Sequence, residues 1–284
     1  MSKSSVLITG SSSGFGELTA RLLAEKGYRV IASMRGVNGK NENKARALRD
    51  WAADKGYSLE VIELDVTDQA SVDAAIEQAG VIDVVVNNAG IGGAGVMETF
   101  TVEQHRQMFD VNYFGVHRVN RAVLPQMRER GSGVLIHVTS VIGRLIFPFA
   151  GPYCPTKFAL EAYAESMYYE YAGLGIQSLI VEPGAYGTDF VGNIMAGADE
   201  ERFKALGDLA KAPEEMFRNM GKMLSGEGAP DPNDIAVAIA DLLDMPADKR
   251  PLRTVADRIS KDIAEGVNVA VAEKQQELMA RFEG

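Results

Sequence analysis

The sequence contains a single cysteine, Cys154, so the chain can form no internal disulfide, as is usual in a reducing compartment. Its three histidines, at positions 105, 117 and 137, are scattered and form no metal-ligand spacing with that cysteine, so no metal site is expected. No stretch approaches the roughly 18 consecutive apolar residues of a membrane span, and the first residues match no signal peptide. These absences predict a cytoplasmic protein without a membrane span.

Positive charge is also scarce, because 29 Lys and Arg residues face 39 Asp and Glu residues, a net charge of −10. Binding to nucleic acid or to an acidic membrane surface needs basic patches, so neither partner is expected. With 284 residues, 46% of them hydrophobic, the chain can bury a sizeable core. Since it has no internal repeat, low-complexity tract or linker, we predict one domain over residues 1–284.

Short apolar segments alternate with helical ones, the pattern of a doubly wound parallel sheet. The segments that read as strands are 5–9, 28–33, 59–65, 81–87, 133–140, 176–184 and 252–255. A long helix is expected at about 102–130 and another at 232–243. We therefore predict a Rossmann-type α/β fold, a doubly wound parallel sheet flanked by helices, with a lid segment at about 189–230 and a C-terminal helical tail at about 257–284.

A glycine-rich turn lies between the first predicted strand and the first predicted helix. Glycine permits a tight turn there, and the backbone N–H groups of a helix N-terminus can bind a pyrophosphate. Any sharp turn can use glycine, but the position at the first strand–helix junction favours a nucleotide site. The candidate cofactor contacts are Gly10, Ser11, Ser12, Ser13, Gly14, Phe15 and Gly16.

Tyr153 and Lys157 lie four residues apart in a helical pattern, so their side chains share one face of the helix. Pro155 is tolerated in a first turn, which places the start of this helix close to Tyr153. The lysine ammonium and the positive end of the helix are expected to lower the phenol pKa toward the range of efficient acid–base catalysis. Ser140, at the end of an apolar strand, supplies a hydroxyl for a carbonyl or alcohol oxygen.

The chain resembles the short-chain dehydrogenase/reductase family over roughly residues 5–256. The resemblance rests on the turn TGxxxGxG from Thr9, the segment NNAG at 87–90, Asn112, Ser140, Tyr153 with Lys157, and Pro183-Gly184 followed by Thr188. It implies an NAD(P)-dependent oxidoreductase acting on CH–OH groups. Tyr153 would be the acid/base, Lys157 would tune it and hold the ribose, and Ser140 would orient the substrate oxygen. Asn112 would hold a water that connects Lys157 to solvent.

The resemblance also implies contacts along the rest of the cofactor. Asp65 would meet the adenine amino group, Gly90 would let the backbone approach the nucleotide, and Thr188 would hold the nicotinamide carboxamide or the phosphates. The implied contacts beyond the glycine turn are Arg35, Asp65, Val66, Asn88, Ala89, Gly90, Tyr153, Lys157, Pro183, Gly184 and Thr188.

Cofactor choice depends on the end of the second predicted strand, where an acid would accept the ribose hydroxyls and repel a 2′-phosphate. Met34 occupies that position here and Arg35 follows it, and a guanidinium suits a phosphate. We therefore predict NADP(H). The alternative is NAD, as in an NAD-dependent alcohol dehydrogenase of the same family.

Apolar residues dominate the segments expected around the substrate, and the predicted lid is rich in methionine, which adapts to varied apolar shapes. We predict an uncharged apolar ketone, aldehyde or secondary alcohol, as in a carbonyl reductase. The family branch that acts on steroids and retinoids looks similar, and a broad aldehyde reductase is an open alternative. A non-catalytic dinucleotide-binding sensor or scaffold is a second class, although it would not need Tyr153. A lyase or epimerase would usually carry a larger substrate domain.

The tail carries Ile259, Ile263, Val267 and Val271 at four-residue intervals. This stripe would cover either the protein's own sheet or a neighbouring subunit. Family members commonly pair through the long helix and the Tyr153 helix, so a homodimer or homotetramer is expected.

Overall fold

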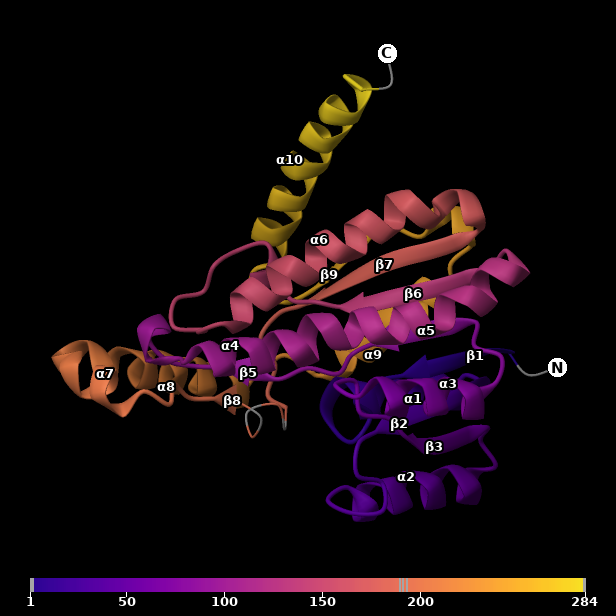
Figure 1. Ribbon diagram of the computed structural model, residues 1–284, viewed down its shortest axis with the longest axis horizontal. Helices are drawn as coiled ribbons and strands as arrows, with labels where there is room; N and C mark the ends of the chain where they lie inside the picture. Colours follow the sequence, from indigo (N-terminus) through magenta and orange to yellow (C-terminus); the bar gives the residue numbers. More distant parts are fainter. Residues whose placement is uncertain (1–2, 189, 191, 193, 283–284) are drawn as a thin grey trace.

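A parallel sheet of seven strands forms the centre of the computed structural model, which describes residues 3–188, 190, 192 and 194–282. The strands are β1 (Lys3–Ile8), β2 (Tyr28–Met34), β3 (Leu59–Glu63), β4 (Val84–Asn87), β6 (Gly133–Val138), β7 (Ile176–Pro183) and β9 (Arg253–Ala256). Their order is β3-β2-β1-β4-β6-β7-β9, so the direction of winding reverses between β1 and β4 (Figure 1). This confirms the predicted Rossmann-type fold.

Helices cover both faces of the sheet because successive strand side chains point to opposite sides. Val6 and Ile8 of β1 pack in one core with α1 (Gly14–Glu25), α2 (Glu42–Lys55) and α9 (Asn233–Asp244). Leu7 of the same strand packs in the other core, with α3 (Gln69–Ala79) and the helices that follow β4. Both faces of β1 are therefore fully buried, and its end is held rigidly between two helix layers.

The helix predicted at 102–130 is confirmed in its bounds, but a wide turn interrupts its regular hydrogen bonding. It consists of α4 (Val102–Phe109), a π-helical turn (Asp110–Phe114) and α5 (Gly115–Arg130). Asn112 lies in the wide turn, and its side chain bonds to Ile91 and Thr156. These long-range bonds fix Asn112 where a regular helix would not place it.

The predicted lid contains more regular structure than expected. β8 (Ile194–Met195) pairs with β5 (Gly92–Gly93), and α7 (Glu200–Ala205) and α8 (Ala212–Ser225) follow. Phe217 of α8 lies with its ring centroid 6.4 Å from that of Phe147, so α8 touches the loop that precedes the Tyr153 helix. Positions 189, 191 and 193 of the predicted lid lie outside the described residues.

The C-terminal helix α10 (Lys261–Ala280) projects from the body of the protein (Figure 1). Only Ala264 within it is buried, and the exposed fractions of Ile263 and Val271 are 56% and 39%. The apolar stripe therefore does not cover the protein's own sheet, and this alternative of the prediction is wrong. No helix in the described part of the chain is long and apolar enough to cross a bilayer.

Candidate active site

The predicted site residues gather at one edge of the sheet. Thr9 follows β1, Arg35 follows β2, Asn88 follows β4, Ser140 follows β6 and Pro183 ends β7. Since all these strands are parallel, their carboxyl ends meet at the same edge, where doubly wound folds bind their ligands.

The glycine turn is shaped for close backbone contact. Gly10 and Gly14 have φ of +72° and +56°, which favour glycine. A side chain at Gly16 would overlap the carbonyl oxygen of Gly10. Ser13 precedes α1 without capping it, so the first-turn N–H groups have no side-chain acceptor, and a pyrophosphate fits there. Thr188 faces this turn, because a Cβ at Gly14 would lie 3.6 Å from its side chain.

Within the turn, Ser11 and Ser12 differ in role. The Ser11 hydroxyl is buried and donates to the carbonyl oxygen of Ile8 at 3.0 Å, while its N–H donates to that of Ser33 at 2.9 Å. Ser11 therefore anchors the turn to β1 and β2. The half-buried Ser12 is left as the neighbouring hydroxyl that can reach a ligand.

α6 (Tyr153–Tyr171) begins at Tyr153, as the proline in its first turn predicted. The Ser140 hydroxyl donates to the carbonyl oxygen of Pro183 at 3.3 Å and accepts from the N–H of Ile142 at the same distance. Lys157 Nζ donates to the carbonyl oxygen of Val138 at 2.9 Å and lies 5.6 Å from the ring centroid of Tyr153. The structure therefore brings the hydroxyl, the phenol and the ammonium together.

The pKa of Tyr153 departs from the expectation. Burial raises it above the ordinary value, and a hydrogen bond with Ser140 opposes this only in part. Burial lowers the pKa of Lys157 to about 8, although the charge of Glu161 raises it somewhat. Burial outweighs the lowering of the phenol pKa that was expected from the ammonium, which donates to Val138 and lies 5.6 Å from the ring centroid. Tyr153 is consequently protonated at neutral pH, ready to donate.

Both polar atoms of the Asn112 side chain form hydrogen bonds within the protein. Its Oδ1 accepts from the N–H of Ile91 at 2.9 Å, and its Nδ2 donates to the carbonyl oxygen of Ile91 and to the hydroxyl of Thr156. A Cβ on Gly90 would lie 3.3 Å from Asn112 Oδ1 and 4.0 Å from Lys157 Nζ, so the three residues are neighbours. The predicted water relay would therefore depend on the backbone around Asn112, where the wide turn alters carbonyl bonding.

The segment after β4 is tied to the glycine turn. Asn88 Nδ2 donates to the carbonyl oxygen of Thr9 at 2.9 Å. The N–H groups of Asn88 and Ala89 both donate to the Thr9 hydroxyl at 3.0 Å. Both segments are thereby held in one rigid unit beside the pyrophosphate position.

Acidic and basic side chains lie together at the end of the predicted cofactor site where the adenine is expected. Partial burial disfavours the charge on Asp65, but hydrogen bonds from Thr67 and the charges of Arg35 and Lys40 lower its pKa. Val66 is buried, and its carbonyl oxygen accepts from Arg118 Nη1 at 3.2 Å. Glu63 accepts from the N–H groups of Gly36 and Val37 at 2.6 and 2.8 Å.

Sequence reasoning missed this carboxylate. Nothing in the sequence marked it, because its place beside Met34 depends on the register of β3 against β2.

Gly184 is required by its neighbour, because a side chain there would overlap the carboxylate of Asp257. Asp257 is buried and accepts from the N–H groups of Ile259 and Ser260 at 3.0 and 2.8 Å. A single buried acid thus supports both the segment expected beside the nicotinamide and the approach to α10. Nothing in the sequence marked Asp257 for this role.

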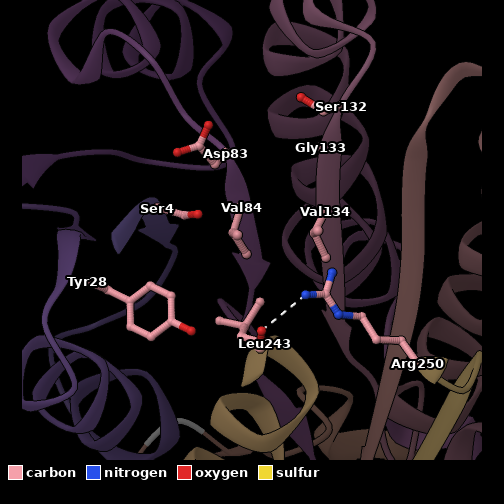
Figure 2. Close-up of a pocket in the computed structure, with 9 residues that line it drawn as sticks. All are labelled: Ser4, Tyr28, Asp83, Val84, Ser132, Gly133, Val134, Leu243 and Arg250. Carbon is pink, nitrogen blue, oxygen red and sulfur yellow. Dashed lines mark hydrogen bonds between the residues drawn. The ribbon is translucent and has the colours of Figure 1, made fainter. Parts of the chain in front are cut away.

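A pocket of about 240 Å³ lies at the other edge of the sheet (Figure 2). Ser4, Val84 and Val134 line it from the amino-terminal ends of β1, β4 and β6. Arg250 enters it but already donates to the carbonyl oxygens of Leu242 and Leu243 and to Gln177. The pocket therefore offers no free cation and is separate from the candidate active site.

The chain is similar to known proteins over most of its length. A model of the short chain dehydrogenase family matches residues 4–199. Retinol dehydrogenase 8 of Homo sapiens is 34% identical over 261 residues, which are 87% of this chain and 79% of that protein. The crystal structure of a short-chain dehydrogenase from Streptomyces avermitilis superposes with a TM-score of 0.77 at 33% identity, covering 100% of this chain and 98% of the other.

Two other solved structures contain a nicotinamide cofactor. An actinorhodin polyketide ketoreductase was solved with NADPH, and a 3-ketoacyl-(acyl-carrier-protein) reductase from Brucella melitensis with NADH. They are 27% and 26% identical to this chain, each with a TM-score of 0.72, and each match covers 90% of this chain and 97% of the other. Proteins of this fold therefore bind either form of the cofactor.

Proposed function

Because the chain belongs to the short-chain dehydrogenase/reductase family, we propose that it is an NADP(H)-dependent oxidoreductase that interconverts an apolar ketone or aldehyde and its alcohol. The observation that carries the proposal is the meeting of Ser140, Tyr153 and Lys157 beside Pro183 and Gly90. A proton donor, a second hydroxyl and a cation at one point are what a carbonyl oxygen needs when its carbon is reduced.

The reaction needs one proton at the substrate oxygen. The hydride for the substrate carbon would come from a nicotinamide bound at this edge of the sheet. Ser140 holds the carbonyl oxygen through its hydroxyl, and Tyr153 donates the phenol proton to that oxygen as the alcohol forms. Lys157, protonated below its pKa of about 8, stabilises the phenolate left behind. The raised pKa of Tyr153 keeps the phenol protonated near neutral pH, which is the form that the reduction step requires.

NADP(H) is proposed over NAD because Arg35 and Lys40 both place positive charge near Asp65 at the adenine end. Glu63 is the competing feature, since its carboxylate occupies the N–H groups of Gly36 and Val37. A 2′-phosphate would have to compete with this carboxylate or sit beside it. The NAD-dependent alternative rests on Glu63.

An apolar substrate is proposed from the side chains around Tyr153. The ring of Phe190 lies 5.9 Å from that of Tyr153, and Phe147 and Phe217 meet where the lid touches the loop. The similarity to retinol dehydrogenase 8 supports a lipophilic carbonyl. We also propose a homo-oligomer that pairs through α5 and α6, and a cytoplasmic location.

The test is Tyr153→Phe, assayed for NADPH consumption with a panel of apolar aldehydes and ketones and for NADPH binding by fluorescence. We expect turnover to fall by about a thousandfold or more, as for loss of a general acid, with the Kd for NADPH changed less than about threefold. Tyr168→Phe, a change at an exposed tyrosine on the same helix, is the matched control. Equal turnover in Tyr153→Phe would contradict the proposed chemistry. Cofactor binding with no turnover in the parent protein would support the sensor or scaffold alternative.

A further inference from the structure

The first turns of α10 pack on the loop that follows Ser140. Ala264 is completely buried in a small core with Val141 and Val255, and Ile142 and Leu145 lie against the same core. The start of α10 is therefore attached to the loop that positions the Ser140 hydroxyl.

One turn further along the helix, Asn268 joins two segments of the site. Its Oδ1 accepts from Arg144 Nε at 3.1 Å, and its Nδ2 donates to Glu182 Oε2 at 2.6 Å. Arg144 belongs to the loop after Ser140, and Glu182 directly precedes Pro183. Since the Ser140 hydroxyl donates to the Pro183 carbonyl oxygen, Asn268 bridges the two segments that meet at Ser140.

The bridge ends in a buried group of charges. Arg253 of β9 lies 3.0 Å from Glu161 and 2.5 Å from Glu165 of α6, and 3.7 Å from Glu182 of β7. Burial, followed by the charge of Glu161, raises the pKa of Glu182 to about 7, whereas the bond from Asn268 lowers it. Glu182 Oε1 has no hydrogen-bond partner among the described residues. The neutral amide of Asn268 is therefore the main donor to a completely buried carboxyl group.

The same group reaches the catalytic helix. Glu161 lies one turn after Lys157, and a Cβ on Gly143 would be 3.0 Å from the Glu161 side chain and 3.1 Å from the Lys157 carbonyl oxygen. The loop after Ser140 is thus pressed against α6 from one side and against α10 from the other.

We propose that Asn268 is a positioning residue for the reaction, holding the Ser140 loop and the Pro183-Gly184 segment in register through Arg144 and Glu182. This inference rests on the proposed function, because the geometry that Asn268 holds is that of the carbonyl-binding hydroxyl. Asn268 itself touches neither substrate nor cofactor. Its effect is expected on the chemical step, whereas the glycine turn holds most of the cofactor.

The first arm compares Asn268→Ala with Gln276→Ala, a change at an exposed position on the same helix. All proteins are assayed at a temperature where each is folded by circular dichroism. We expect Asn268→Ala to lower kcat about tenfold, with the Kd for NADPH changed less than about threefold and Gln276→Ala unchanged. An unchanged kcat in Asn268→Ala overturns the proposal.

The second arm uses pH as a readout that a general loss of stability would not reproduce. In Asn268→Asp, the new carboxyl faces Glu182, and Glu161, Glu165, Arg144 and Arg253 are the other charged groups of this cluster. At low pH a shared proton restores a hydrogen bond to Glu182, and at high pH two carboxylates repel. The kcat of Asn268→Asp, divided by that of the parent protein, is expected to fall from pH 6 to pH 9. The same ratio for Asn268→Ala is expected not to change with pH. Equal pH dependence in both variants overturns the proposal.

A third arm separates this proposal from the proposed function. Amide hydrogen exchange is measured at Ile142, whose N–H donates to Ser140, and at Gly184, whose N–H donates to Ala256. Asn268→Ala is expected to exchange faster at both amides than Gln276→Ala, whether or not any carbonyl is reduced. If the parent protein reduces no carbonyl, the proposed function fails while this arm still decides whether Asn268 holds the two segments. Unchanged exchange at both amides overturns the inference.

Discussion

Burial acts in opposite directions on the two ionisable groups of the candidate active site. It raises the pKa of the Tyr153 phenol and lowers the pKa of the Lys157 ammonium to about 8, because each is driven toward its neutral form. Tyr153 is therefore a proton donor over the whole neutral range. Lys157 is the group whose charge changes near physiological pH.

The pH profile of kcat/KM for NADPH should report this lysine in the free enzyme. We expect kcat/KM to fall as pH rises through about 8, where the ammonium loses its proton. Glu161→Gln removes a charge that raises the pKa of Lys157, so the inflection is expected at lower pH. Glu129→Gln, at an exposed position on α5, is the control. An inflection that stays in place in Glu161→Gln would contradict this assignment.

Arg35 is the residue expected to favour NADPH over NADH. Arg35→Ala is expected to weaken NADPH binding by about tenfold and leave NADH binding within about twofold, because only NADPH carries a 2′-phosphate. Fluorescence titration with both cofactors measures this, and Arg46→Ala, an exposed change on α2, is the control.

Glu63→Gln is expected to strengthen NADPH binding if its carboxylate competes with the phosphate. Tighter NADH than NADPH binding in the parent protein would favour the NAD-dependent alternative.

At the scale of elements, the candidate active site lies at the carboxyl ends of the strands, and its shape depends on the turns that follow them. The segment from Pro183 to Gly184 is held from outside by Asp257, which leaves no room for a side chain. Gly184→Ala is expected to lower the free energy of unfolding by about 1–3 kcal/mol through overpacking and to weaken cofactor binding. Gly173→Ala has no neighbour within 4 Å of the added Cβ and serves as the control. Denaturant unfolding measures the free energy of unfolding of both variants. Equal values would show that the Asp257 side chain can move away from an added methyl group at no cost in stability.

The strands and the motifs after them could be predicted because each strand is an apolar run that ends in glycine or a polar residue. The start of α6 was also predictable, since proline fits a first turn. The π-helical turn was not, because Asn112 takes its partners from Ile91 and Thr156, which local periodicity cannot bring together. Local periodicity likewise does not reveal the buried charges of Glu182 and Arg253, whose partners lie on other elements.

The pKa of Tyr153 is the clearest limit of sequence reasoning in the site. Helical spacing places Lys157 on the same face, and from this alone a lowered phenol pKa follows. The pKa instead depends first on burial and then on the hydrogen bond with Ser140, both of which need the packed loop and strand.

At the scale of the whole molecule, exposed aromatic side chains mark the helices expected to pair. Phe114, at the end of the π-helical turn, is 48% exposed, and Phe158 of α6 is 38% exposed. Phe114→Asp is expected to shift the protein from an oligomer to a smaller species in light scattering, because a buried charge would oppose association. Val237→Asp, at an exposed position on α9, should leave the mass unchanged. A monomeric parent protein would contradict the proposed assembly.

The support of Gly184 by Asp257 also bears on synthesis. The glycine turn leaves the ribosome more than 200 residues before β9 and Asp257 do. A nascent chain can thus form the glycine turn well before Asp257 is present to support Gly184. Chains interrupted before β9 would therefore gain less stability from the cofactor than finished copies.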